Sequence, residues 1–144
     1  MWGDLMANIE FKDYSIEVKN ALVSLAYKAV EEACGELESQ TKRNTAVDTG
    51  QTKNAWTHNV KTSNVETTGT VGNPLENAIW EEFGTGEYAL NGDGRKGGWF
   101  YKDAEGVGHF TRGKHPRRAF WNAYTTLKNK LIKHMQDIFK GGLS

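Results

Sequence analysis

A long amphipathic segment dominates the first third of the chain. From Ser15 to about Arg43, apolar residues recur at spacings of three and four, which places them on one face of a helix. Asp13 or Ser15 can cap the first turn, and acidic residues decorate the outer face. The apolar stripe consists of Val18, Leu22, Leu25, Ala26, Ala29, Val30, Ala33 and Leu37. We therefore predict a long helix over residues 15–45, preceded by an arm over residues 1–14.

A second amphipathic stripe lies at the other end of the chain. Its apolar residues again follow the helical period, and Gly141 with Gly142 ends it. Pro116 is tolerated in a first helical turn, because the N–H that proline lacks has no helical acceptor there. The stripe consists of Phe120, Ala123, Tyr124, Leu127, Leu131, Met135, Ile138 and Phe139. We predict a C-terminal helix over residues 114–144.

Two stretches between these helices have the composition of β-hairpins. Residues 56–72 are rich in Thr and Val, with a polar break at Ser63 and Asn64. Two aromatic segments, 99–102 and 109–112, flank a turn that contains two glycines. Each stretch therefore predicts a pair of antiparallel strands.

Two shorter segments complete the middle of the chain. Residues 49–56 resemble a short helical turn capped by Asp48 or Thr49. Residues 77–83 are apolar enough for a short helix or a strand, and periodicity does not separate the two. The order of elements predicts a single α+β domain over the whole chain. In that domain the two long helices pack on a small antiparallel sheet, and residues 46–113 hold the strands and a glycine-rich insertion.

Charge and glycine are unevenly distributed along this chain, although its formal net charge is zero. Residues 1–38 hold eight acidic and three basic side chains, whereas residues 95–118 hold seven basic and two acidic ones. Nine of the sixteen glycines lie between Gly84 and Gly113, so the positive excess and the glycines share one segment. We expect that segment to become ordered only when contacts with a partner offset its entropy.

Several functional classes are disfavoured by the sequence. No stretch approaches the roughly 18 apolar residues of a membrane-spanning helix, and residues 1–11 do not resemble a secretion signal. Cys34 is the single cysteine, which excludes a disulfide framework and a Cys/His zinc site. Residues 92–97 match G-x-G-x-x-G, but a strand-like segment follows where a dinucleotide site needs a helix. No nucleophile, base and oxyanion donor are assembled, so we predict a protein that is not an enzyme and holds no cofactor or metal.

A basic run precedes the C-terminal helix. Residues 112–118 contain four basic residues and no acidic one. Positive charges at a helix N-terminus interact unfavourably with the helix dipole unless a negative group pairs with them. The run is a solvated loop, or it binds phosphates, or it meets acidic residues of a neighbouring copy such as Glu76. Nearby aromatic side chains either stack on bases or pack in a core or interface. The candidate interface residues are Glu81, Glu82, Arg95, Lys96, Arg112, Lys114, Arg117 and Arg118.

Three segments, taken in order, resemble a known protein family. Residues 47–55 resemble the P-V-D-T-G-x-L-x-x-S segment of the head–tail connector proteins, also called neck or tail-completion proteins, of long-tailed bacteriophages. Residues 78–86 are similar to their Y-x-x-Y-V-E-F-G-T segment. Residues 111–120 resemble the G-x-x-P-x-P-F-L-x-P-A segment that leads into their last helix, although the usual Pro-Phe-Leu is lacking. In the first of the three segments, Gln51 and Thr52 stand where Arg and Leu are usual. The matching motif residues are Asp48, Thr49, Gly50, Glu82, Phe83, Gly84 and Thr85.

The resemblance implies a structural protein of the virion that is made in the cytoplasm of the host bacterium. It implies copies in a ring at the junction of head and tail, in contact with neighbouring connector and tail proteins, without catalysis and without a membrane. The ring lumen allows transient contact with phage DNA.

Opposite charges on separated segments suit the heterologous contacts of a ring. We therefore expect the acidic face of the first helix, or Glu81 and Glu82, to meet the basic segment of the adjacent copy. The alternative function, from another class, is a nucleic-acid-binding module that uses the basic, glycine-rich segment.

Overall fold

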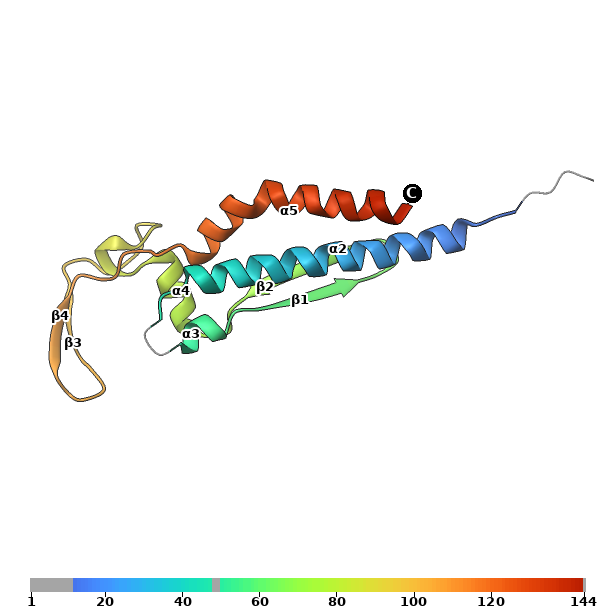
Figure 1. The fold of residues 1–144 in the computed structure, drawn as a ribbon. Coiled ribbons are helices and arrows are strands. Elements are labelled where there is room, and N and C mark those ends of the chain that lie inside the picture. The colour runs from blue at the N-terminus through green and yellow to red at the C-terminus, as the bar shows by residue number, and fades with distance from the viewer. Residues whose placement is uncertain (1–11, 48–49, 144) are drawn as a thin grey trace, which may run out of the picture.

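The computed structural model of the chain describes residues 12–47 and 50–143. It has an α+β fold in which two long helices and two antiparallel hairpins form an elongated molecule (Figure 1). In chain order the elements are α2 (Ser15–Asn44), α3 (Gln51–Asn54), β1 (Thr57–Thr62), β2 (Thr67–Gly72), α4 (Glu76–Phe83), the 3-10 helix η1 (Gly86–Tyr88), β3 (Trp99–Lys102), β4 (Gly108–Thr111) and α5 (Ala119–Leu143). The predicted fold class is confirmed.

Helix α2 sets the long axis of the molecule. Its 30 residues span about 45 Å at the usual rise per residue. Ser15 donates its backbone N–H to the Asp13 carboxylate at 2.9 Å, so the predicted role of Asp13 at the helix start is confirmed. The β1–β2 hairpin packs on α2, and α5 packs chiefly on α2 rather than on strands (Figure 1). The four strands form two separate hairpins, whereas we had expected one sheet under both helices.

The core of the described chain is small and built mostly from small side chains. Ala33 of α2 packs with Leu127 and Leu131 of α5, and Leu37 and Met135 lie against this cluster. Cys34 is buried beneath the β1–β2 hairpin, and this burial raises the pKa of its thiol. Cys34 therefore packs as a small buried side chain.

The start of α5 differs from the prediction. We expected the helix to begin at residue 114, near Pro116, but it begins at Ala119. Arg118 has a φ of 57°, in the left-handed region, and this conformation breaks the helical path just before Ala119. Arg117 donates its backbone N–H to the Glu81 carbonyl oxygen at 2.7 Å, which holds this approach segment against α4.

The middle of the chain follows most of the sequence predictions. Both predicted hairpins form, as β1–β2 and β3–β4, and residues 77–83 form a helix rather than a strand. The short helical turn forms as α3, which begins after Gly50. Asp48 and Thr49, the predicted cap, lie outside the described residues, so that cap stays a prediction.

The glycine-rich segment is held by the chain itself, which corrects our expectation that it needs a partner to order. Thr85 donates its backbone N–H to the Lys114 carbonyl oxygen, and Glu87 donates to that of Arg112, both at 2.9 Å. The two backbones approach so closely at Gly86 that a Cβ there would lie 2.8 Å from the Gly113 Cα. Glycine at position 86 therefore permits two pieces of backbone to cross.

Candidate functional site

The second and third family-like segments meet at a corner between α4 and the start of α5. Glu82, only 8% exposed, accepts the backbone N–H of Phe120 at 3.1 Å and that of Trp121 at 2.9 Å. N–H groups in a first helical turn have no helical acceptor, and a negative charge there is favoured by the helix dipole. Glu82 of α4 therefore caps α5 across the fold.

Arg118 completes this corner, which we call the Glu82–Arg118 corner. Its guanidinium lies 5.3 Å from the ring centroids of both Phe83 and Trp121. Its Nη1 lies 3.8 Å from Glu82 Oε1, within ion-pair distance. A planar guanidinium can pair with a carboxylate while its faces contact aromatic rings. The left-handed backbone at Arg118 thus places its side chain between α4 and α5.

The rest of the basic run also pairs with acids of its own chain, but one positive charge is left over because Glu81 is the partner of both Lys114 and Arg117. Lys114 forms an ion pair with Glu81, and Arg117 Nε lies 3.9 Å from Glu81 Oε2. Arg112 Nη1 lies 3.6 Å from Glu87 Oε2. In this structure Glu81 and Glu82 pair with the basic segment of their own chain, so their expected contact with an adjacent copy stays a prediction.

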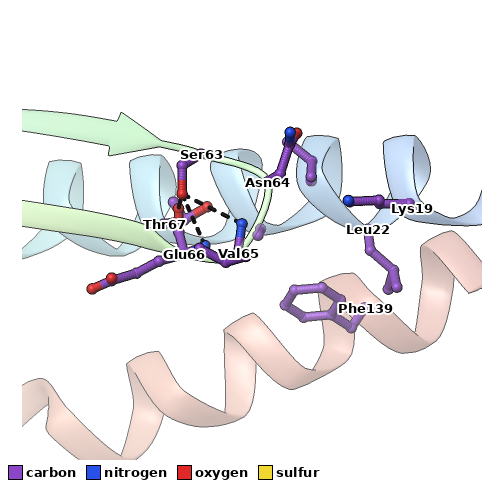
Figure 2. Close-up of a pocket in the computed structure, with 10 residues that line it drawn as sticks. Lys19, Leu22, Ser63, Asn64, Val65, Glu66, Thr67 and Phe139 are labelled. Carbon is purple, nitrogen blue, oxygen red and sulfur yellow. Dashed lines mark hydrogen bonds between the residues drawn. The ribbon is translucent and has the colours of Figure 1, made fainter. Parts of the chain in front are cut away.

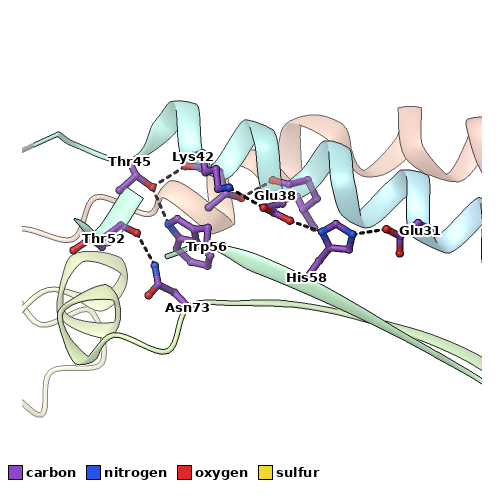
Figure 3. A network of polar contacts seen from close by, with 10 residues as sticks. Glu31, Glu38, Lys42, Thr45, Thr52, Trp56, His58 and Asn73 are labelled. Atoms are coloured by element: carbon purple, nitrogen blue, oxygen red, sulfur yellow. Dashed lines mark hydrogen bonds and ion pairs between the residues drawn. The ribbon is translucent and has the colours of Figure 1, made fainter. Parts of the chain in front are cut away.

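The acidic face of α2 is engaged in the same way. Glu31 and Glu38 both contact His58 of β1, with Glu31 Oε1 at 2.8 Å from His58 Nε2 (Figure 3). On the α5 side, Glu32 pairs with His134 at 2.7 Å and Glu36 with Lys130 at 2.8 Å. These four acids therefore have partners within their own chain, but none of the partners belongs to the basic segment 95–118, and the expected contact of this face with an adjacent copy stays a prediction.

Polar contacts fasten the base of the β1–β2 hairpin to the end of α2 (Figure 3). The buried Trp56 donates its indole N–H to Thr45 Oγ1 at 2.9 Å, and the Thr45 hydroxyl donates to the Thr41 carbonyl oxygen at 2.7 Å. Asn73, after β2, donates to the Thr52 carbonyl oxygen at 2.8 Å. Sequence patterns did not indicate the bonds of Trp56 and Asn73, because their partners lie 11 and 21 residues away in the chain.

The contacts of His58 make stability depend on pH. A hydrogen bond to Glu31, and to a smaller extent one to Glu38, raises the pKa of His58 above its usual value of about 6.5. Hydrogen bonds to Lys42 and His58 lower the pKa of Glu38. Because the folded-state pKa of His58 is the higher one, its proton stabilises the folded chain fully below about pH 6.5, and this contribution is lost as pH rises through the folded-state value.

We therefore expect the stability advantage of the wild-type chain over His58→Gln to shrink between about pH 6 and pH 9. Urea unfolding of both proteins at these two pH values measures it. His115→Gln serves as the control, since His115 stacks on Tyr88 and has no carboxylate partner within the described residues. An advantage of wild type over His58→Gln that stays constant across this range would contradict the prediction.

The remaining predicted site residues, Arg95 and Lys96, are not brought to the Glu82–Arg118 corner. Arg95 lies over the Trp99 ring, 5.4 Å from its centroid. Lys96 and Lys102 are exposed and form no ion pair with any described residue. The structure therefore divides the predicted interface set into residues paired at or near the Glu82–Arg118 corner and two cations, Arg95 and Lys96, that form no ion pair with a described residue.

The small core leaves many large apolar side chains on the surface, which sequence reasoning missed. Phe100 on β3 is 81% exposed and Phe110 on β4 is 52% exposed, and their ring centroids lie 5.0 Å apart. The β3–β4 hairpin forms no packed interface with another helix or strand of residues 12–47 and 50–143 (Figure 1). The aromatic pattern of these strands predicted the hairpin but not its isolation.

Two of the grooves on the described chain have mostly apolar walls and lie beside the long helices or α4. One, of about 520 Å³, borders the Glu82–Arg118 corner and is lined chiefly by Trp56, Val71, Ile79, Phe83, Phe120 and Trp121. We call it the α4 groove. The other, of about 270 Å³, lies between the tip of the β1–β2 hairpin and the two long helices, with Leu22 and Phe139 at its edge (Figure 2). Neither groove follows from sequence periodicity, because each combines residues from several elements.

Comparisons with protein families, curated proteins and solved structures find no match to this chain. Among the described residues, no helix has the length and apolar character needed to cross a membrane.

Proposed function

We propose that this chain is a structural protein of a long-tailed bacteriophage that joins head to tail. Copies assemble in a ring and bind the neighbouring connector and tail proteins, without catalysis. The chain resides at the head–tail junction of the virion and is made in the host cytoplasm. The motif resemblance supports the family, and the apolar surface supports assembly.

The exposed apolar surface is the observation that carries the proposal. Monomeric proteins rarely expose extended apolar patches, whereas the centres of protein interfaces are enriched in aromatic side chains. Here about half of the exposed large apolar side chains of the described residues, including most of the aromatic ones, lie toward one end of the molecule, on or beside α4, η1, the β3–β4 hairpin and the start of α5. They are Ile79, Trp80, Phe83, Tyr88, Leu90, Phe100, Tyr101, Phe110 and Trp121. Covering this surface with other subunits supplies the burial that the small core lacks.

A nucleic-acid-binding module remains the alternative, with less support. Phosphate binding needs cations that are free to replace counterions. Arg112, Lys114, Arg117 and Arg118 are paired with acids of their own chain. Only a few cations near β3 stay available among the candidates, and a ring accommodates weak DNA contact through them.

Deletion of the coding sequence from its phage or prophage tests the proposed function. Electron microscopy of the induced lysate should show filled heads and detached tails, and supplying the wild-type chain in trans should restore joined particles. Portal, capsid and tail-tube genes are expected nearby. Normal, joined particles made without the chain would overturn the proposal.

A further inference from the structure

The β3–β4 hairpin presents one apolar face that nothing in its own chain covers. Phe100 pairs with Phe110 and Lys102 with Gly108 across the two strands. Side chains two residues apart on a strand share a face, so Phe100, Lys102 and Phe110 lie on the same side. A lone two-stranded hairpin is marginally stable in water, and packing of one face is what usually stabilises it. This face therefore has both the chemistry and the energetic reason to bind a surface.

The outer side of α4 has the complementary chemistry. Ile79 and Phe83, 52% and 40% exposed, line the α4 groove together with Trp121 at 48%. Glu76 is three residues before Ile79 and seven before Phe83, which places it on the same helix face. Glu76 is exposed and forms no ion pair or hydrogen bond with its side chain in the described chain. The groove thus offers apolar surface with one unpaired carboxylate beside it.

We propose that the β3–β4 hairpin of one copy docks in the α4 groove of the next copy. Phe100 and Phe110 enter the groove, and Lys102 pairs with Glu76. This inference rests on the proposed self-assembly and names its interface.

Spacing and charge both favour a second copy as the occupant. Lys102 lies about 7 Å along β3 from Phe100, and Glu76 lies about 5–6 Å from Ile79 on α4, so an aromatic contact and an ion pair can form together. Each patch has one unpaired charge, and the two charges are opposite. Every copy carries one hairpin and one groove, so a head-to-tail contact repeated around a closed ring leaves neither patch uncovered.

A mixing experiment tests the contact on the full chain. Phe100→Ser/Phe110→Ser removes the hairpin anchors, and Ile79→Asp blocks the groove. Sedimentation velocity should show assemblies for wild type and an increase in Kd of at least about 30-fold for each variant alone. A one-to-one mixture of the variants should form a heterodimer, because it retains one intact hairpin and one intact groove. All of these residues are exposed, and circular dichroism with thermal unfolding checks that the variants fold.

A charge exchange tests the predicted pair. Lys102→Glu and Glu76→Lys should each weaken association about 5–10-fold, and combining both changes in one chain should restore most of it. Lys61→Glu is the matched control: Lys61 on β1 is also exposed and unpaired among the described residues but lies outside the β3–β4 hairpin face, so its substitution should leave association unchanged. Restoration by the double variant cannot come from a merely structural role of either residue.

The possible failures of this inference and of the proposed function are distinct. Assemblies that persist in Phe100→Ser/Phe110→Ser and in Ile79→Asp would overturn the interface while leaving the ring intact. A wild-type chain that stays monomeric up to about 1 mM would overturn docking between copies, even if gene deletion still gives detached tails. In that case the hairpin binds another virion protein.

Discussion

Glu82→Gln should lower the free energy of unfolding by about 3 kcal/mol, a very large effect for so small a chemical change. Glu82 makes charge-assisted bonds to the N–H groups of Phe120 and Trp121 and pairs with Arg118. A hydrogen bond to a charged group contributes about 1.5–3 kcal/mol, and removing the Glu82 carboxylate also leaves the partly buried Arg118 without its ion-pair partner. Glutamine keeps the shape of the side chain, but one carboxylate oxygen becomes an amide N–H₂ group. That group then faces a backbone N–H or the Arg118 guanidinium, which are donors as well and cannot accept its hydrogen bond.

Chemical denaturation at low protein concentration measures this loss, with Glu76→Gln as the matched control. Glu76 lies on the same helix but is exposed, so its substitution should change stability by no more than about 0.5 kcal/mol. Arg118→Met and the double variant complete a cycle, in which a coupling of about 1–3 kcal/mol is expected between positions 82 and 118. Equal, small effects of Glu82→Gln and Glu76→Gln would show that the corner does not hold α5.

Gly86→Ala should be nearly as damaging, by about 3 kcal/mol. Gly86 has a φ of 62°, which costs a residue with a Cβ about 1–2 kcal/mol. The added Cβ would also lie 2.8 Å from the Gly113 Cα and would collide with the Arg112 carbonyl group. Forcing a methyl group into a close-packed site costs about 1–3 kcal/mol more.

Gly92→Ala separates these two causes. Gly92 has a φ of 72°, but a Cβ there would meet nothing within 4 Å. It should therefore lose only the conformational part, about 1–2 kcal/mol. Thermal unfolding of both variants measures the difference, and a loss at Gly86 no larger than that at Gly92 would exclude the backbone crossing as the reason for glycine.

Local patterns predicted the elements well, because their signals lie within a few residues. The apolar period of α2 and α5 and the turn residues between strands each depend on near neighbours in the sequence. The error at α5 has a non-local cause: Arg118 adopts its left-handed backbone where its side chain reaches Glu82, Phe83 and Trp121.

The charge pattern was more misleading than the apolar one. Sequence positions show which segments are acidic or basic, but not which acid a base faces after folding. Glu32 pairs with His134, which is 102 residues away, and Glu81 with Lys114, which is 33 residues away. The charge imbalance along the sequence therefore did not show which of these groups pair within one copy. The exposed hairpin face and the α4 groove arise from the tertiary fold, so no local signal predicted their surroundings.

In the alanine-rich core, substitutions that enlarge a side chain are more destabilising than substitutions that shorten one, which is the reverse of the usual pattern in protein cores. Five of its buried positions are already occupied by one of the smallest side chains: Ala29, Ala33, Ala78, Ala119 and Ala123. Truncation there has almost nothing to remove, whereas nearly every other residue is larger and must displace a neighbouring helix. We therefore expect homologous chains to keep residues of similar size at these buried positions. The exposed aromatic surface can change more, together with the protein that covers it. Relatives of this chain should therefore be easier to trace through small residues at helix contacts than through their large hydrophobic ones.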